Sequence, residues 1–227
     1  MAEMVITIDG PAASGKSTVA RLVAQKLGAS FLDTGAMYRA VTLAAMKAGV
    51  DMSDEKELLG VMRTSKFQFS VKDGLTMVSI DGVDVSDEIR SPEVTAKARY
   101  IASAAMVREK LVRMQRQFAA GEKKIVTEGR DQGTVAFPDA GIKFYLTARI
   151  AERARRRQAE LRAKGIDSGI EEIQASLEKR DRSDQSRTVG PLKIAKDAII
   201  INTTNLNIEE VVEKVLGFVK TKCSKKN

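Results

Sequence analysis

The sequence feature that most constrains the fold is the octapeptide Gly10-Pro-Ala-Ala-Ser-Gly15-Lys16-Ser17, which matches the pattern G-x-x-x-x-G-K-[ST]. A short β-branched run, Met4 to Ile8, precedes it and is typical of a buried strand. Apolar residues then recur at helical spacing from Val19 to Leu27 and end at Gly28, which indicates an amphipathic helix. A strand, a glycine loop and a helix in this order open a βαβ unit, so we interpret the octapeptide as a phosphate-binding loop rather than a chance glycine-rich turn.

The residues of this loop indicate its chemistry. An anionic triphosphate must be held closely by backbone N–H groups, which a glycine-permissive loop allows, and the helix that begins near Lys16 adds its positive N-terminal end. We expect Lys16 to reach the β- and γ-phosphates and Ser17 to lie where Mg²⁺ binds. The residues expected to contact the phosphates are Gly10, Pro11, Ala12, Ala13, Ser14, Gly15, Lys16, Ser17 and Thr18.

Strand-like runs and helical segments alternate along most of the chain. Further buried strands are expected at Lys124 to Thr127, Ile142 to Leu146 and Ala198 to Ile201, and a last helix at Ile208 to Val219. Helical periodicity also covers residues 101–118. This alternation predicts an α/β fold, with a mostly parallel sheet covered by helices on both faces.

Residues 67–85 have a different pattern. Apolar and polar residues alternate there, and Asp-Gly pairs at Asp73 and Asp81 separate the runs. Asp-Gly between alternating runs is a strong signal for a tight hairpin turn. The stretch is therefore predicted to be a small antiparallel meander inserted into the α/β pattern.

The composition excludes several classes of function. The chain of 227 residues contains no histidine, which rules out a Ser-His-Asp triad, a histidine general base and histidine metal sites. Cys223 is the only cysteine, so no intrachain disulfide can form and a reducing cytoplasm is the expected setting. No apolar run reaches the roughly 18–20 residues of a membrane span, and the first residues do not resemble a signal peptide.

The net charge of +8 is concentrated in one segment. Nine arginines lie between Arg149 and Arg187, and no Phe, Tyr or Trp occurs from residue 146 to 217. A solvated helix face and a lobe that grips phosphate both remain open as interpretations. Single-strand nucleic-acid binding is disfavoured, because such proteins interleave basic groups with stacking aromatics. The segment is predicted to be helical with a break near Gly165 to Gly169, where Ser168-Gly-Ile-Glu171 fits a capping box.

Absent motifs narrow the class of phosphate-binding protein. No Asn-Lys-x-Asp tetrapeptide of the kind that GTPases use to read guanine occurs, and the Leu-Ser-Gly-Gly-Gln signature of ABC transporter ATPases is absent too. The chain is also short for a motor or a helicase. Small-molecule kinases remain, and these need a second pocket for an anionic acceptor.

A series of further motifs runs through the chain in order. These are Ile6-Thr-Ile-Asp9-Gly-Pro, Asp33-Thr-Gly-Ala-Met-Tyr38-Arg39, Glu88-Ile-Arg90, Val107-Arg108, Glu128-Gly-Arg130-Asp131-x-Gly133-Thr134 and Arg180-Asp-x-x-Asp184-x-x-Arg187. The series resembles that of bacterial cytidylate kinases over residues 4–217. The resemblance implies a P-loop NTPase core of residues 1–61, 93–150 and 190–227, a nucleoside monophosphate (NMP)-binding insertion of residues 62–92 and a helical LID of residues 151–189.

The resemblance also implies an activity and its partners. ATP would donate its γ-phosphoryl group to CMP or dCMP with Mg²⁺ present, giving ADP and CDP or dCDP. The expected partners are these nucleotides alone, with no nucleic acid and no membrane, and the protein is expected to be a cytoplasmic monomer.

The resemblance assigns roles residue by residue. Arg39 and Arg130 would bind the acceptor phosphate, Arg108 and Asp131 the cytosine edge, and Arg180 and Asp184 the sugar. The full set expected to bind the acceptor is Thr34, Tyr38, Arg39, Arg108, Arg130, Asp131, Arg180 and Asp184. The side chains expected to neutralise charge on the moving phosphoryl group are Lys16, Arg153, Arg156, Arg157 and Arg187.

Several of these residues also have plain structural explanations. Arg39 follows a turn on a helix and could be a surface arginine, while Arg130 and its neighbouring carboxylates could form a structural ion pair. Arg180 and Asp184 are spaced as a helix pair that contributes only about 0.3–0.5 kcal/mol. Two alternative functions remain open: a kinase for another small molecule and a nucleic-acid-binding ATPase.

The sequence departs from the family pattern at two positions. Arg99 stands where many members carry a serine that helps to read the base, and Ser103 lies one helical turn further on. Ala105 stands where a proline commonly precedes the Val-Arg pair. These departures bear on base discrimination and not on phosphoryl transfer, and the preference between CMP and dCMP stays open.

Overall fold

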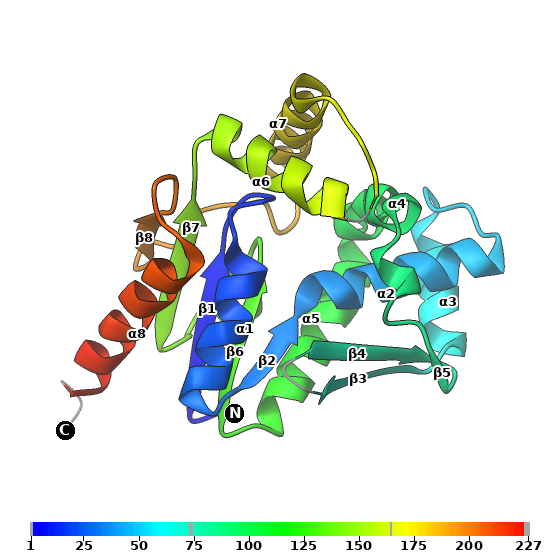
Figure 1. The fold of residues 1–227 in the computed structure, drawn as a ribbon. Coiled ribbons are helices and arrows are strands. Elements are labelled where there is room, and N and C mark those ends of the chain that lie inside the picture. The colour runs from blue at the N-terminus through cyan, green and yellow to red at the C-terminus, as the bar shows by residue number, and fades with distance from the viewer. Residues whose placement is uncertain (1, 73–74, 164, 225–227) are drawn as a thin grey trace.

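Five short strands form one sheet at the centre of the computed structural model, which describes residues 2–72, 75–163 and 165–224 (Figure 1). Across this sheet the order is β2 (Ser30–Asp33), β6 (Lys124–Gly129), β1 (Met4–Asp9), β7 (Ile142–Thr147) and β8 (Ile199–Asn202). Every neighbouring pair is parallel. The predicted parallel sheet is confirmed.

The register of β1 and β6 decides where the loops of the sheet meet. The two strands pair from Met4 opposite Lys124 to Asp9 opposite Gly129, so they end side by side. Because all five strands run the same way, their carboxyl ends lie at one edge of the sheet. Ligands of open α/β sheets bind at this edge.

Helices cover both faces, because successive residues of a strand point to opposite sides. Val126 of β6 packs in the layer with α1 (Lys16–Leu27) and α8 (Ile208–Ser224). Its neighbour Ile125 packs in the opposite layer, with α2 (Thr34–Ala48), α3 (Glu55–Thr64) and α5 (Ala105–Ala120). The predicted helix after the glycine loop ends at Gly28 in a left-handed conformation, as the sequence indicated.

A separate antiparallel sheet of three strands confirms the predicted meander. It consists of β3 (Phe67–Lys72), β4 (Leu75–Ile80) and β5 (Val83–Asp84). Asp81 and Gly82, both with positive φ, form the second predicted turn; the first, Asp73-Gly74, lies outside the described residues. Val78 and Val85 bury this sheet against α2.

The chain continues from this sheet through one short turn of helix into two longer helices. The short turn is η1 (Glu88–Arg90), and α4 (Pro92–Ser103) follows it and packs on α2. The predicted helical stretch over residues 101–118 is divided between α4 and α5 by the extended residue Ala104. A single π-helical turn, η2 (Gln132–Ala136), follows β6.

Two charged helices, α6 (Ile150–Ala163) and α7 (Ile170–Ser186), lie over the carboxyl edge of the sheet (Figure 1). Ala154, Ile173 and Leu177 form a small core with Ala12 of the loop after β1. The predicted capping box at residues 168–171 is wrong. The cap position of α7 falls on Gly169, one residue later than Ser168, and no side chain caps the helix.

The packing of α5 generates a stability prediction. Leu111 is fully buried between α5 and the sheet, whereas Met106 on the same helix is 56% exposed. We expect Leu111→Ala to lower the free energy of unfolding by about 2–5 kcal/mol, because the lost methyl groups leave a cavity. Met106→Ala should change it by less than about 0.5 kcal/mol. Urea denaturation of both variants checks this, and equal losses would contradict the assigned packing.

Candidate active site

The loop after β1 turns sharply to reach the N-terminus of α1. Gly10 has φ 155°, and a Cβ there would overlap the carbonyl oxygen of Leu146 on β7. Gly15, with φ 88°, directly precedes the first helical residue, Lys16. The predicted junction of strand, glycine loop and helix is therefore present, and it lies at the carboxyl edge of the sheet.

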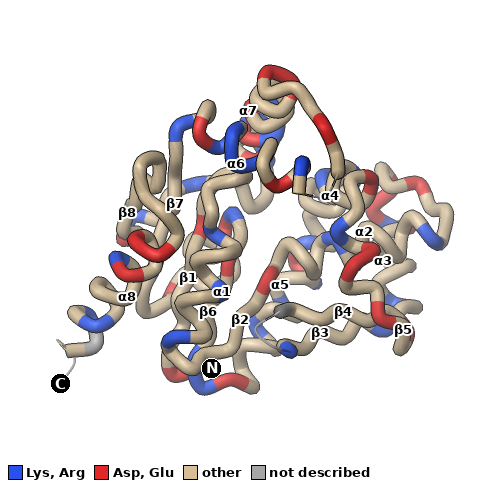
Figure 2. Tube along the Cα trace, viewed as in Figure 1, with Lys and Arg blue, Asp and Glu red and all other residues tan. Residues whose placement is uncertain are grey.

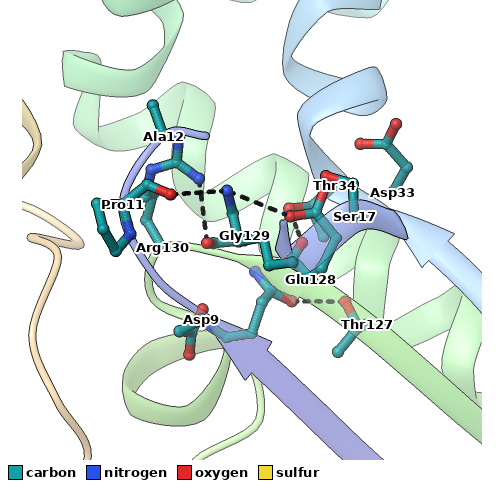
Figure 3. A network of polar contacts seen from close by, with 12 residues as sticks. Asp9, Pro11, Ala12, Ser17, Asp33, Thr34, Thr127, Glu128, Gly129 and Arg130 are labelled. Atoms are coloured by element: carbon teal, nitrogen blue, oxygen red, sulfur yellow. Dashed lines mark hydrogen bonds and ion pairs between the residues drawn. The ribbon is translucent and has the colours of Figure 1, made fainter. Parts of the chain in front are cut away.

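Lys16 and Ser17 converge on one carboxylate, that of Glu128 at the end of β6 (Figure 3). The Lys16 Nζ lies 3.2 Å from the Pro11 carbonyl oxygen and 3.8 Å from Glu128 Oε2. Ser17 Oγ donates to Glu128 Oε1 at 2.9 Å. Burial lowers the pKa of Lys16, the nearby Arg130 guanidinium lowers it further, and Glu128 opposes both effects.

Glu128 is a site residue that the sequence reasoning missed. It is buried, and burial followed by repulsion from Asp33 raises the pKa of its carboxyl although Lys16 opposes this. Its backbone carbonyl also accepts from Thr34 Oγ1 at 2.7 Å. The sequence did offer one signal for this role: Glu128 is a carboxylate at the end of a predicted buried strand.

Asp33 joins two arginines at the start of α2. Its Oδ1 accepts from the backbone N–H of Ala36, which caps the helix. Its Oδ2 lies 3.2 Å from Arg39 Nη2 and 3.7 Å from Arg90 Nη2. Arg39 is therefore held by a carboxylate at the end of β2 instead of lying free on the helix surface. The sequence reasoning had not assigned Asp33 to the site.

The predicted sugar-binding pair is arranged differently from the helix pair that its spacing suggests. Asp184 pairs with Arg130 across the cleft, Oδ2 to Nε at 2.7 Å, and with Arg187 at 3.5 Å. Burial disfavours the charge of Asp184, but Arg130 and then Arg187 hold its pKa below the ordinary value. Arg180 is exposed and has no hydrogen bond or ion pair to any residue in the described part of the chain.

Arg108 and Asp131 form a buried ion pair, with Arg108 Nη2 bonded to Asp131 Oδ2. Arg108 also donates to the carbonyl of Ala102 at 3.1 Å, and its guanidinium lies 5.3 Å from the ring centre of Tyr38. The Tyr38 hydroxyl is buried without a hydrogen-bond partner among the described residues, and burial raises its pKa. Gly190 lies against this pair so closely that a Cβ would overlap both charged groups.

The predicted charge-neutralising arginines of α6 differ in their contacts. Arg153 is buried, donates to the Ala12 carbonyl of the glycine loop at 3.1 Å and pairs with Asp181 at 2.7 Å. Arg156 donates to the carbonyl and hydroxyl oxygens of Thr203, while Arg157 pairs with Glu160 on the helix surface. Arg153 thus contacts the glycine loop at Ala12, and Arg156 lies against it at Gly15. Arg187 pairs with Asp184 instead.

A cavity of about 1070 Å³ opens beside the glycine loop, between α6 and the segment that precedes α8. The lining includes Gly15, Thr18, Arg156, Thr204, Asn205 and Asn207. Thr203 fixes this wall, because its hydroxyl donates to the Ser14 carbonyl at 3.2 Å. The sequence reasoning missed Thr203, Thr204, Asn205 and Asn207, because the segment 203–208 carries no motif and only the fold brings it to the loop.

Asp9, the last residue of β1, is a buried carboxylate at the same edge (Figure 3). Its two oxygens accept from the backbone N–H groups of Gln132 at 2.9 Å and Gly133 at 2.8 Å. Burial raises the pKa of Asp9 to about 7 although both hydrogen bonds oppose the shift.

Figure 2 shows acidic and basic positions close together along α6 and α7. In the described part of the chain, no three acidic or other metal-ligating side chains gather into a cluster that could hold a metal ion by themselves. None of the helices among the described residues is both long and apolar enough to cross a membrane.

A glycine loop at the head of a helix, a buried lysine and several largely buried arginines paired with carboxylates define a P-loop phosphotransferase. The family model for cytidylate kinase matches residues 6–221. The chain belongs to the cytidylate kinase family.

Relatives and solved structures are similar to this chain to different degrees. The cytidylate kinases of Bacillus thuringiensis (strain Al Hakam) and Bacillus anthracis (strain A0248) are each 45% identical over 214 residues, which cover 94% of this chain and 95% of theirs. A shikimate kinase structure from Bacteroides thetaiotaomicron has a TM-score of 0.49 at 13% identity, covering 96% of this chain and 98% of that one. TT1252 from Thermus thermophilus reaches 0.48 at 17% identity with the same coverage. These two likenesses are too weak to bear on function.

The pKa of Asp9 predicts how stability depends on pH. Between its ordinary value of 3.8 and about 7, the folded protein keeps a proton at Asp9 that the unfolded chain has released. The free energy of unfolding contributed by Asp9 therefore falls as pH rises through this interval, by up to about 4 kcal/mol. Urea denaturation of the wild type and Asp9→Asn at pH 4.5, 6 and 7.5 measures this. A difference between the two proteins that does not change with pH would contradict the prediction.

Proposed function

We propose that the protein transfers the γ-phosphoryl group of ATP to CMP or dCMP, giving ADP and CDP or dCDP. The observation that carries this is a buried Lys16 in the glycine loop, near Arg130 and Arg180. Burial lowers the pKa of Lys16, and the two guanidinium charges lower it further although Glu128 opposes them. Cations held together in this way are stabilised by anions between them. Two phosphate-bearing substrates supply such anions.

The donor occupies the glycine loop. Backbone N–H groups of the loop bind the β- and γ-phosphates, and Lys16 balances their charge. The cavity beside Gly15, with Thr204 and Asn205 in its wall, takes the nucleoside end of ATP. Arg156 supports that wall through its two hydrogen bonds to Thr203, which makes it a positioning residue for the donor.

The acceptor phosphate binds on the other side of Glu128, where Arg39 and Arg130 face the cleft. Both guanidiniums are already held by carboxylates, Arg39 by Asp33 and Arg130 by Asp184. An arginine fixed in this way presents its remaining N–H groups in a defined direction, which suits a phosphate. Thr34 lies next to them and adds a hydroxyl. Asp184 and the exposed Arg180 are placed to contact the sugar.

Arg108 and Asp131 read the base. Cytosine presents an amino donor beside a ring-nitrogen acceptor, and uracil presents a carbonyl beside an N–H at the same places. The guanidinium and carboxylate of this pair match cytosine as donor and acceptor. With UMP, the N–H of uracil would face the guanidinium donor and its carbonyl would face the carboxylate acceptor, which would leave buried polar groups unpaired.

Mg²⁺ fits the oxygen ligands beside the donor site. Ser17 Oγ and the Glu128 carboxylate are 2.9 Å apart, and both are hard oxygen donors of the kind that Mg²⁺ accepts. Burial of Glu128 near Asp33 makes its negative charge costly, which a dication would relieve. When bound, Mg²⁺ neutralises charge on the phosphates.

Transfer itself needs little covalent help from the protein. A phosphate oxygen of CMP attacks the γ-phosphorus, the bond to the β–γ bridging oxygen breaks, and ADP leaves with that oxygen. Lys16, Arg153 and Arg187 stabilise the charge on the moving group, with no general base required because the attacking phosphate is already ionised. Arg157 reaches this group only if α6 moves.

Residues 151–189 act as a LID over the donor, and residues 62–92 act as the NMP-binding lobe beside the acceptor, around a core of the remaining residues. Within the LID, Arg153 pairs with Asp181 and Arg187 with Asp184, and each of these arginines is 8% exposed at the side chain. We further propose a cytoplasmic enzyme that acts as a monomer.

A panel of acceptors tests the proposed function. In a coupled assay of ADP release, CMP and dCMP should both be good acceptors, and kcat/KM for UMP should be lower by about 5–150-fold, for the loss of about 1–3 kcal/mol. Equal kcat/KM for UMP and CMP would contradict the base-reading pair. Phosphorylation of a sugar acid but not of CMP would contradict the proposed function as a whole.

Lys16→Ala tests the donor site. Lys16 points at the phosphate-binding loop and packs little apolar surface, so the variant should lose at least about 100-fold in kcat and keep its melting temperature within a few degrees. Lys47→Ala is a matched control, because Lys47 is exposed and pairs only with Glu88 at 2.7 Å. Near-wild-type turnover of Lys16→Ala would remove the donor-site assignment.

A further inference from the structure

The segment that carries Asp131 has an unusual cap. Asp131 directly precedes η2 and occupies its cap position, yet its own side chain makes no capping hydrogen bond. Aspartate at such a position normally accepts from the first free N–H groups of the helix with its own carboxylate. Asp54 does this for α3, through the N–H groups of Lys56 and Glu57, and Asp33 does it for α2.

A carboxylate from a different strand supplies this cap. Asp9 at the end of β1 accepts from Gln132 N–H at 2.9 Å with one oxygen and from Gly133 N–H at 2.8 Å with the other. These are the first two N–H groups of η2. Asp131 is thereby released from capping, and its carboxylate turns to Arg108 instead.

We propose that Asp9 is a positioning residue for acceptor recognition, which holds Asp131 in its base-reading orientation by capping η2 in its place. This rests on the proposed function, because Asp131 and Arg108 are the groups that read cytosine there. It also ties the two substrate sites together, since Asp9 is followed directly by Gly10 of the donor loop.

The side chains around Asp9 are closely packed and mostly already hydrogen-bonded. Gln132 is buried, and its side chain is already used: its amide oxygen accepts from Thr127 Oγ1 at 3.0 Å, and its amide nitrogen donates to Gln115 at 3.3 Å. Gly133 is closely packed, since a Cβ there would lie 3.0 Å from Thr7 Oγ1 and 3.4 Å from Asp9 Oδ2. If Asp9 loses an acceptor, the carboxylate of Asp131, at the cap position of η2, is available for these N–H groups.

Asp9→Asn is the direct test, with kinetics measured near pH 8, where Asp9 is ionised. An amide keeps one acceptor oxygen but opposes an NH₂ group to the second N–H, so Asp131 should be drawn back to cap η2. We expect the KM for CMP to rise roughly tenfold and the ratio of kcat/KM for CMP over UMP to fall roughly tenfold, which corresponds to one lost interaction of about 1.4 kcal/mol. The KM for ATP should stay within about twofold, because the donor loop keeps its own contacts. A merely structural role would lower stability without changing base discrimination.

A matched control and a second route to the same effect complete the experiment. Asp54→Asn removes the charge of another capping aspartate, which accepts from Lys56 and Glu57 with one oxygen at the start of α3, and should leave acceptor kinetics unchanged. Gly133→Ala pushes the Gly133 N–H away from Asp9 without altering Asp9, and should give the same loss of discrimination on a smaller scale. If Asp9→Asn does not fold, Gly133→Ala alone decides, and unchanged discrimination in it overturns the inference.

A double-mutant cycle identifies the route of the effect. If Asp9 acts through Asp131, then Asp9→Asn added to Asp131→Asn should change the KM for CMP by less than about twofold. Losses that multiply in the double variant would overturn the inference. A wild type with no preference for CMP over UMP would overturn the proposed function and the inference with it, whereas a selective wild type with unaffected variants overturns the inference alone.

Discussion

The parallel pairing of β1 with β6 is the constraint on which the site depends. Its register sets Asp9 beside Gly129, so the donor loop and the segment Glu128–Asp131 leave the sheet at neighbouring points. Lys16 and Ser17 can then share the carboxylate of Glu128, although Glu128 lies more than a hundred residues further along the chain. A slip of one residue in this pairing would turn each side chain of β6 to the opposite face and separate these groups.

Charge inside the cleft is balanced by specific pairs. Arg108 faces Asp131, Arg130 faces Asp184 and Arg153 faces Asp181, all largely withdrawn from solvent. Buried pairs of this kind contribute little to stability, because desolvation cancels most of the attraction. Their benefit is orientation: a guanidinium held by one carboxylate has fixed directions left for a phosphate or a base. These pairs therefore fix the arginines in position before substrate binds, although they add little to the stability of the fold.

Two arginines of α6 join this helix to the donor loop and its support by hydrogen bonds. Arg153 reaches the carbonyl of Ala12, and Arg156 reaches Thr203, which is itself bonded to Ser14. Both contacts end on the donor loop or its immediate support. Any movement of α6 is therefore transmitted to the loop that holds the triphosphate, which is the arrangement expected where lid closure accompanies transfer.

The sequence by itself determined the glycine loop, the parallel strands, the antiparallel insertion and the residue types of the cleft, because hydrophobic period, Asp-Gly turns and the P-loop spacing are local signals. Only the tertiary structure decided which charged side chains pair with one another. Spacing suggested that Arg180 would hold Asp184, but folding places Arg130 there, and Asp9 caps a segment 123 residues away. Glu128, Asp33, Gly190 and the 203–208 wall were likewise missed or left unassigned. The physical reason is that a buried charge takes whichever opposite charge or N–H the packing brings within hydrogen-bond distance, and no sequence period records that distance.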